Sequence, residues 1–184
     1  MIDFRLPLLR FSRAVLTLRI ILQIPTSTQP GTPPQEDMEM TTSLKGKRAL
    51  VTGASSGLGA EFARQLAAGG CHLVLVARRE EALTALASEL TQQHGVEANV
   101  FSQDLSTADA AQHLFDRVQA ANLEVDILIN NAGYGVHGEF MTQKLSALTG
   151  MLQLNMVTLT ELTRLFAEPM IERGDGYLVQ VGSV

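Results

Sequence analysis

The segment that most constrains the fold of this chain is the octapeptide 52–59, Thr-Gly-Ala-Ser-Ser-Gly-Leu-Gly. It follows the apolar run 49–51 and leads into a segment of helical periodicity that begins at Leu58. A strand, a glycine turn and a helix in that order form the context that a phosphate-binding turn requires. Glycines let the backbone pass close to a pyrophosphate, and the free N–H groups of the helix start face the anion. The segment therefore predicts a nucleotide-binding turn.

Apolar runs and helical segments alternate from Lys45 to the end of the chain. Buried strands are expected at residues 49–52, 72–77, 98–101, 125–130 and 177–181, and helices at 58–68, 80–93 and 144–167. Ser106 and Thr107 are candidate caps of a further helix, in which Ala111, Leu114, Phe115 and Val118 show helical spacing. This alternation predicts an α/β fold, a Rossmann-like doubly wound parallel sheet with about five strands and helices on both faces.

A polar residue or a glycine follows each expected strand. Gly53, Arg78, Asp104, Asn131 and Ser183 come after the first to the fifth strand in turn. In open parallel sheets, ligands bind at the carboxyl ends of the strands. Loops are polar in any protein, but five strand ends in succession favour a site at that edge.

Several functional classes are disfavoured by composition and motif. The net charge is −5 and no basic stripe is present, which argues against nucleic acid as a partner. The single cysteine and four scattered histidines lack metal-site spacing, so no metal is expected. The glycine turn lacks the lysine of a P-loop, and no G-x-S-x-G elbow surrounds Ser183. ATPases, GTPases and serine hydrolases are therefore disfavoured.

The cofactor preference is expected to depend on Arg78 and Arg79. A fold that binds NAD usually places an acid after the second strand, to hold the ribose 2′-hydroxyl. Here two arginines stand there, and the first acid is Glu80. Guanidinium groups bind a 2′-phosphate bidentately, so the sequence predicts NADP(H). The alternative is that both arginines only solvate the start of a helix.

Asp104, Asn155 and Ser183 each allow two interpretations. Asp104 could accept a hydrogen bond from adenine, with Leu105 against the ring, or it could cap a helix. Asn155 lies on the apolar face of the helix 144–167. It could serve a reaction centre or bond to a bend in its own helix, and a buried amide costs about 1–3 kcal/mol if unsatisfied. Ser183 could hold a substrate carbonyl oxygen or be a turn serine.

Residues 1–40 differ in composition from the domain at 45–184. The first 24 residues carry four arginines and one acid among many leucines and isoleucines, and a proline-rich linker follows. The arginines interrupt the apolar run, so no spanning helix is expected. Three interpretations are open: a targeting or membrane-surface segment, a disordered extension, or sequence upstream of a true start near Met38 or Met40.

Taken together, these motifs resemble the short-chain dehydrogenase/reductase family, from about Lys45 to Val184. The resemblance rests on the octapeptide, Asp104-Leu105, residues 130–133 (Asn-Asn-Ala-Gly), Asn155 and the strand end at Ser183. It implies hydride transfer between NADPH and a small ketone or alcohol. It implies a catalytic role for Ser183, which would orient the carbonyl, and for Asn155, which would support a proton-relay water. The implied cofactor-binding residues are Gly53, Ser55, Ser56, Gly57, Leu58, Gly59, Arg78, Arg79, Asp104, Leu105, Asn131, Ala132 and Gly133.

One departure from the family pattern limits this expectation. The family's acid/base tyrosine lies in a Y-x-x-x-K motif beyond the Ser183 position, whereas Tyr134 and Tyr177 are the only tyrosines here and neither precedes such a lysine. The chain therefore looks like the first two-thirds of an enzyme and is expected to be inactive as it stands. A cytoplasmic location is expected, with organelle targeting or membrane-surface association through the N-terminal segment as the alternative. Whether the full-length protein forms a homo-oligomer is open. The strand at 177–181 is expected to be an uncovered edge. The alternatives are a non-catalytic NADP-binding module and a non-functional fragment.

Overall fold

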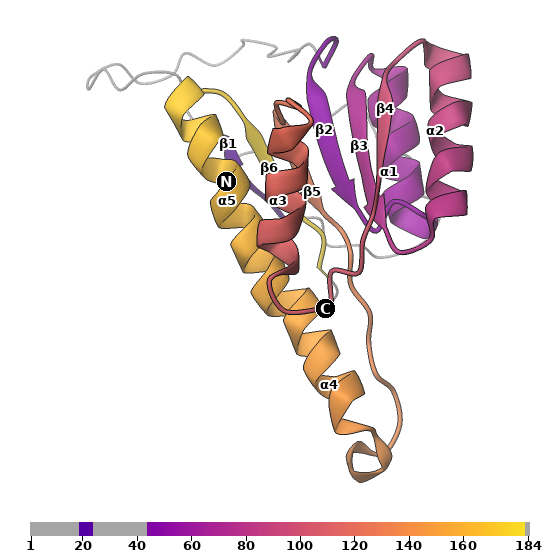
Figure 1. Cartoon of the computed structure of the whole chain (residues 1–184), viewed down its shortest axis with the longest axis vertical. Helices are drawn as coiled ribbons and strands as arrows, with labels where there is room; N and C mark the ends of the chain where they lie inside the picture. The colour runs from indigo at the N-terminus through magenta and orange to yellow at the C-terminus, as the bar shows by residue number, and fades with distance from the viewer. Residues whose placement is uncertain (1–18, 24–43, 183–184) are drawn as a thin grey trace.

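The computed structural model describes residues 19–23 and 44–182, and these form a six-stranded sheet with helices on both faces (Figure 1). The strand order is β1-β6-β5-β2-β3-β4, and every neighbouring pair from β6 to β4 is parallel. The strands are β1 (Arg19–Gln23), β2 (Arg48–Thr52), β3 (His72–Ala77), β4 (Ala98–Ser102), β5 (Ile127–Asn130) and β6 (Tyr177–Gln180). The expected α/β doubly wound parallel sheet is confirmed.

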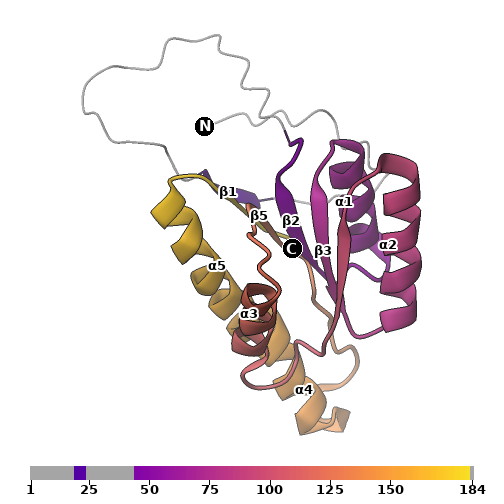
Figure 2. The same ribbon diagram turned by 45° about the horizontal axis from the view of Figure 1, so that its top comes forward.

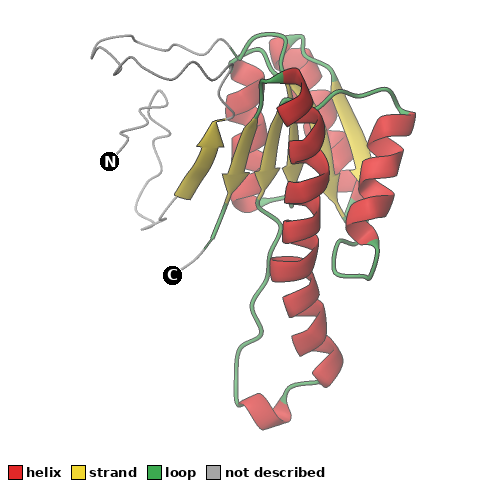
Figure 3. Ribbon diagram, turned by 90° about the vertical axis from the view of Figure 1, so that its left-hand side faces the viewer, coloured by secondary structure: helices red, strands yellow, loops and turns green. Residues whose placement is uncertain are grey.

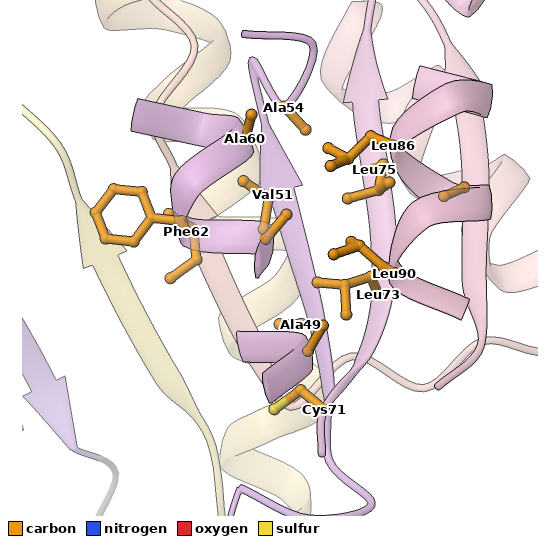
Figure 4. Close-up of a cluster of buried hydrophobic side chains, with 14 of the residues drawn as sticks. Ala49, Val51, Ala54, Ala60, Phe62, Cys71, Leu73, Leu75, Leu86 and Leu90 are labelled. Carbon is orange, nitrogen blue, oxygen red and sulfur yellow. The ribbon is translucent and has the colours of Figure 1, made fainter. Parts of the chain in front are cut away.

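Strand alternation sends successive side chains into two separate cores. Ala49 and Val51 of β2 pack beneath α1 (Gly57–Ala68) and α2 (Glu80–His94), where Figure 4 shows them beside Leu73 and Leu75. Leu50 faces the other way, toward α3 (Ala110–Ala120) and α5 (Leu159–Arg173). The two helix layers are visible on opposite sides of the sheet in Figure 2. Each fully buried leucine or valine stabilises the fold by about 1.5–3 kcal/mol, and β2, which lies between β5 and β3, contributes such residues to both cores.

The chain changes direction between β2 and β5. From β2 it moves outward through β3 to β4, then returns to place β5 on the opposite side of β2, with β6 beyond it. The carboxyl ends of β2 and β5 therefore lie side by side at the point where the strand order reverses. Ligands of open α/β sheets bind in the crevice at such a switch point.

The helix expected at 144–167 is longer and less regular than its sequence pattern indicates. It runs as α4 (Leu145–Leu152), a π-helical turn η2 (Gln153–Thr158) and then α5, which ends at Arg173. Figure 3 shows α4 projecting beyond the sheet, with the short helix η1 (Phe140–Thr142) near its tip. The prediction of one regular helix was wrong, because apolar periodicity does not register a single wide turn.

Two further expectations differ from the structure. Ser106 and Thr107 do not cap a helix: α3 begins at Ala110 with Asp109 at its N-cap, and both hydroxyls bond to Asp104 instead. The edge of β6 is also paired, because β1 runs antiparallel to it with Arg19 opposite Gln180 and Ile20 opposite Val179. The strand within the N-terminal extension thus covers the edge that was expected to be open.

No helix within residues 44–182 has both the length and the apolar character needed to cross a bilayer, and the strand at 19–23 adds none. In the same residues, no three His, Cys, Asp or Glu side chains gather closely enough to hold a metal ion.

Candidate functional site

The glycine turn joins the end of β2 to the start of α1 and leaves open space in front of the helix. Gly53 and Gly57 have φ of 68° and 57°, a region that side chains other than glycine rarely adopt. Ser56 is the N-cap of α1 but makes no side-chain cap bond, so the first N–H groups lack the usual cap. A Cβ on Gly57 would meet nothing within 4 Å. The turn therefore presents free donors to an open space, which fits an anionic group.

Gly59 is required for a different reason, which is close packing. A Cβ there would overlap the Gly53 carbonyl oxygen and lie 2.6 Å from Nδ2 of Asn131. Under 3.0 Å such a contact forces the neighbouring atoms to move. The absence of a side chain at Gly59 thus lets α1 pack directly on the turn and on the end of β5.

Thr52 connects the ends of the two central strands. Its Oγ1 accepts the N–H groups of Asn131 and Ala132, both at 2.9 Å, and donates to the Ile129 carbonyl at 3.3 Å. The Asn131 side chain returns a bond from Nδ2 to the Thr52 carbonyl at 2.9 Å. Thr52 is only 1% exposed, so water does not compete for these bonds. Gly53 and Asn131 therefore lie close together at the carboxyl edge of the sheet. Thr52, which was not among the expected site residues, joins the two strand ends.

Arg79 turns back onto the glycine turn. Its Nη2 donates to Oγ of Ser56 at 2.8 Å, to Oγ of Ser55 at 3.1 Å and to the Ser55 carbonyl at 3.2 Å. The guanidinium is exposed, so it remains accessible to a ligand from the solvent side. The structure thus places one cation and two hydroxyls together beside the turn. All three are groups that bind phosphate oxygens.

Asp104 holds the loop after β4 in a tight turn. Its Oδ1 accepts the Ser106 hydroxyl at 2.7 Å and the Ser106 N–H at 2.9 Å. Partial burial works to raise the pKa of this carboxyl, but the two bonds from Ser106 and the charge of Arg78 outweigh it and lower the pKa. The carboxylate therefore stays ionised at neutral pH. The loop also fixes Leu105, which is 4% exposed.

Asn155 is exposed, and its partner is a distant loop. The expectation of a buried amide on an apolar helix face is therefore wrong. Its Oδ1 accepts the Tyr134 N–H at 3.2 Å and its Nδ2 donates to the Tyr134 carbonyl at 2.9 Å. Asn155 lies within the π-helical turn η2, which reorients its side chain relative to a regular helix. The amide thus anchors the loop after β5. Gly133 in that loop lies so close that a Cβ added to it would be 3.2 Å from Oδ1 of Asn155.

Ser183 lies outside the described residues, and its role stays a prediction. The other expected residues fall into four groups at the carboxyl edge of the sheet. The first is the glycine turn with Asn131 and Ala132, and the second is Arg79 with Ser55 and Ser56. The third is Asp104 with Leu105, and the fourth is Asn155 with Gly133. Arg78 is exposed and adds charge near Asp104.

Comparison with known proteins identifies relatives over most of the chain. The family profile described as short chain dehydrogenase matches residues 47–184. A fatty acyl-CoA reductase of Acinetobacter baylyi is 37% identical over 145 residues, which are 77% of this chain and 48% of that protein. A very-long-chain 3-oxoacyl-CoA reductase of Laccaria bicolor is 32% identical over 169 residues, 91% of this chain and 48% of the relative. The chain spans about half the length of these curated relatives.

Solved structures agree with this relationship. A short-chain dehydrogenase from Sphingobium yanoikuyae in complex with NADPH has a TM-score of 0.70 and 36% identity, over 75% of this chain and 54% of that one. A metagenomic short-chain oxidoreductase in complex with NADP has a TM-score of 0.72 and 38% identity, over 78% of this chain and 65% of the other.

Proposed function

The chain belongs to the short-chain dehydrogenase family, and we propose that it forms the NADP(H)-binding part of an oxidoreductase that acts on a ketone or the corresponding alcohol. The observation that carries the proposal is the contact of Arg79 with Ser55 and Ser56 beside the glycine turn. A 2′-phosphate distinguishes NADP(H) from NAD(H), and this cluster offers it a guanidinium and two hydroxyl donors. The NADPH and NADP bound by two structural relatives support the assignment.

Each part of the site has a proposed binding role. The N–H groups at the start of α1 and the open space before Gly57 would receive the pyrophosphate. Asp104 and Leu105 would bracket the adenine, and the backbone from Asn131 to Gly133 would line the adenosine ribose. When bound, the reduced nicotinamide supplies the hydride of the reaction.

The residues proposed for catalysis are Asn155 and Ser183. Asn155 holds the loop at Tyr134 in place, and its amide is exposed to a water that could take part in proton transfer. Ser183 would donate a hydrogen bond to the substrate oxygen as negative charge develops there. A tyrosine acid/base would have to come from elsewhere in a longer protein. Tyr134 and Tyr177 do not fit the Y-x-x-x-K pattern, because the residues four positions further on are glycine and valine rather than lysine. The 184-residue chain is therefore expected to show no reductase turnover.

A non-catalytic NADP-binding module is the second candidate, because the contact of Arg79 with Ser55 and Ser56 would serve cofactor binding alone equally well. Both candidates predict binding of NADP(H) by the present chain. They differ in whether coding sequence downstream of Val184 supplies the tyrosine and lysine. A homo-oligomer and a cytoplasmic location remain proposals for the longer protein.

Fluorescence titration with NADPH and NADH tests the cofactor assignment. We expect the wild-type chain to bind NADPH more tightly, and Arg79→Asp to lose most of that preference, by about tenfold to a hundredfold, since a charge-assisted bond contributes about 1.5–3 kcal/mol. Arg117→Asp replaces an arginine bonded to Ser102 and Gln103 and serves as the matched control. Equal affinity of the wild type for NADPH and NADH would refute the assignment.

A further inference from the structure

The π-helical turn η2 bonds to two loops of the site, and one of those bonds comes from a buried hydroxyl that the proposed function does not use. Oγ1 of Thr158 donates to the Leu105 carbonyl at 2.9 Å, across 53 residues of sequence. Thr158 is 1% exposed, and Leu105 is 4% exposed. The bond therefore lies out of reach of solvent, where a lost partner is costly.

The same hydroxyl also accepts a hydrogen bond from within η2. Nε2 of Gln153 donates to Oγ1 of Thr158 at 3.2 Å, and these two residues are the first and last of η2. Asn155 lies between them and bonds to Tyr134. The turn η2 thus makes one internal hydrogen bond, one hydrogen bond to the loop after β4 and two hydrogen bonds to the loop after β5.

We propose that Thr158 is a positioning residue that couples the loop at Asp104-Leu105 to the placement of Asn155 on Tyr134. A π turn is less favourable than a regular helical turn and persists where its surroundings hold it. Here the Leu105 carbonyl holds it through Thr158. Anything that orders the Leu105 loop therefore stabilises the wide turn, and with it the Asn155 contact.

The coupling has a consequence for the ligand, and this part rests on the proposed NADP(H) site. The adenine half of the cofactor would contact Asp104 and Leu105, whereas Asn155 and Tyr134 would lie toward the reacting half. Binding at the first position would then order the second without touching it. Such an effect requires that the adenine half of the cofactor bind more tightly when η2 is ordered than when η2 is loosened.

Thr158→Val tests the coupling, because valine keeps the shape and removes the hydroxyl. Thr158→Ser restores the hydroxyl. The matched control is Thr160→Val, since the Thr160 hydroxyl donates to the Met156 carbonyl of η2 itself, at 2.7 Å, rather than to a loop of the site. Circular dichroism and the urea midpoint show that each variant is folded before it is compared.

The first measurement is amide hydrogen exchange at Tyr134 without ligand. We expect exchange to be about fivefold to tenfold faster in Thr158→Val, as loss of a bond of about 1 kcal/mol implies, and unchanged in Thr158→Ser and Thr160→Val. A merely structural role of Thr158 would act on its neighbours and leave Tyr134 alone. An unchanged Tyr134 rate in folded Thr158→Val would overturn the proposal.

The second measurement adds adenosine 2′,5′-bisphosphate, which carries the adenine half and the 2′-phosphate but no nicotinamide. We expect it to slow Tyr134 exchange in the wild type and in Thr160→Val, but not in Thr158→Val. Equal slowing in Thr158→Val would refute the coupling. Failure of the wild type to bind either this probe or NADPH would refute the proposed function instead, while the ligand-free measurement still decides the role of Thr158.

Discussion

The side chain of Asn155 bonds to both main-chain polar groups of Tyr134, accepting from its N–H at 3.2 Å and donating to its carbonyl at 2.9 Å. A planar amide can pair in this way with one residue only if that residue presents its two groups in the same direction. The contact therefore fixes both the position and the orientation of the loop after β5. It joins that loop to a π-helical turn that lies 21 residues further along the chain.

Asn155→Asp should remove one of the two hydrogen bonds of this contact. A carboxylate can still accept the Tyr134 N–H, but it cannot donate to the carbonyl and repels it. Because the site is exposed, water replaces part of the loss, and we expect a decrease of about 1 kcal/mol or less in the free energy of unfolding. Urea denaturation measures this change, and Asn155→Ala should destabilise by a similar amount. A loss of several kcal/mol would show that Asn155 does more than hold the loop.

Thr52→Val should destabilise the fold strongly although it preserves the side-chain volume. The N–H groups of Asn131 and Ala132 would be left without their buried acceptor. Each unsatisfied group costs about 1–3 kcal/mol, so a total loss of about 2–6 kcal/mol is expected for the two groups. Thr52→Ser keeps the hydroxyl and should recover most of it. Equal stability of the valine and serine variants would contradict the role assigned to this hydroxyl.

Gly59→Ala should be far more damaging than Gly95→Ala. At Gly59 the added Cβ meets the Gly53 carbonyl and Nδ2 of Asn131, whereas at Gly95 nothing lies within 4 Å. The cost at Gly95 is only that of φ at 68°, about 1 kcal/mol. At Gly59 the turn itself must shift, so we expect loss of NADPH binding as well as stability. NADPH titration of both variants distinguishes the two effects, and intact binding by Gly59→Ala would contradict the packing argument.

Cys71 should make the stability of the fold sensitive to alkaline pH. Burial, together with the charge of Asp126 and against that of Lys47, raises the pKa of its thiol from 9.0 to about 11. Between these values the unfolded chain releases a proton that the folded chain retains. Stability should therefore fall as the pH rises above 9.0. Thermal unfolding across this range should show the fall in the wild type and a smaller one in Cys71→Ala.

The same thiol should resist alkylation in the folded protein. It is fully buried and donates to the Leu44 carbonyl at 3.2 Å, and the thiolate is the reactive form. Iodoacetamide at neutral pH should label Cys71 only at the rate at which the chain unfolds. Rapid labelling under native conditions would show that the segment around Leu44 opens locally.

Strand and helix positions were predictable because they depend on neighbouring residues. The buried strands β2 and β3 appear as unbroken apolar runs, and the helix α2 shows the apolar spacing of one buried face. The glycine turn was predictable for the same reason, since a strand, three glycines and a helix follow one another directly. The wide turn η2 was not, because Gln153–Thr158 keeps a helical composition.

The sequence by itself determined the doubly wound α/β sheet, the glycine turn between β2 and α1, and the presence of two arginines at the position where an acid would favour NAD. These follow from local backbone preference and from the periodicity with which apolar residues are buried. Only the tertiary structure decided the partners of the polar side chains. Asn155 reaches Tyr134, Thr158 reaches Leu105 and Arg79 reaches Ser56. Such bonds join residues far apart in the chain, and their geometry exists only once the helices have packed on the sheet.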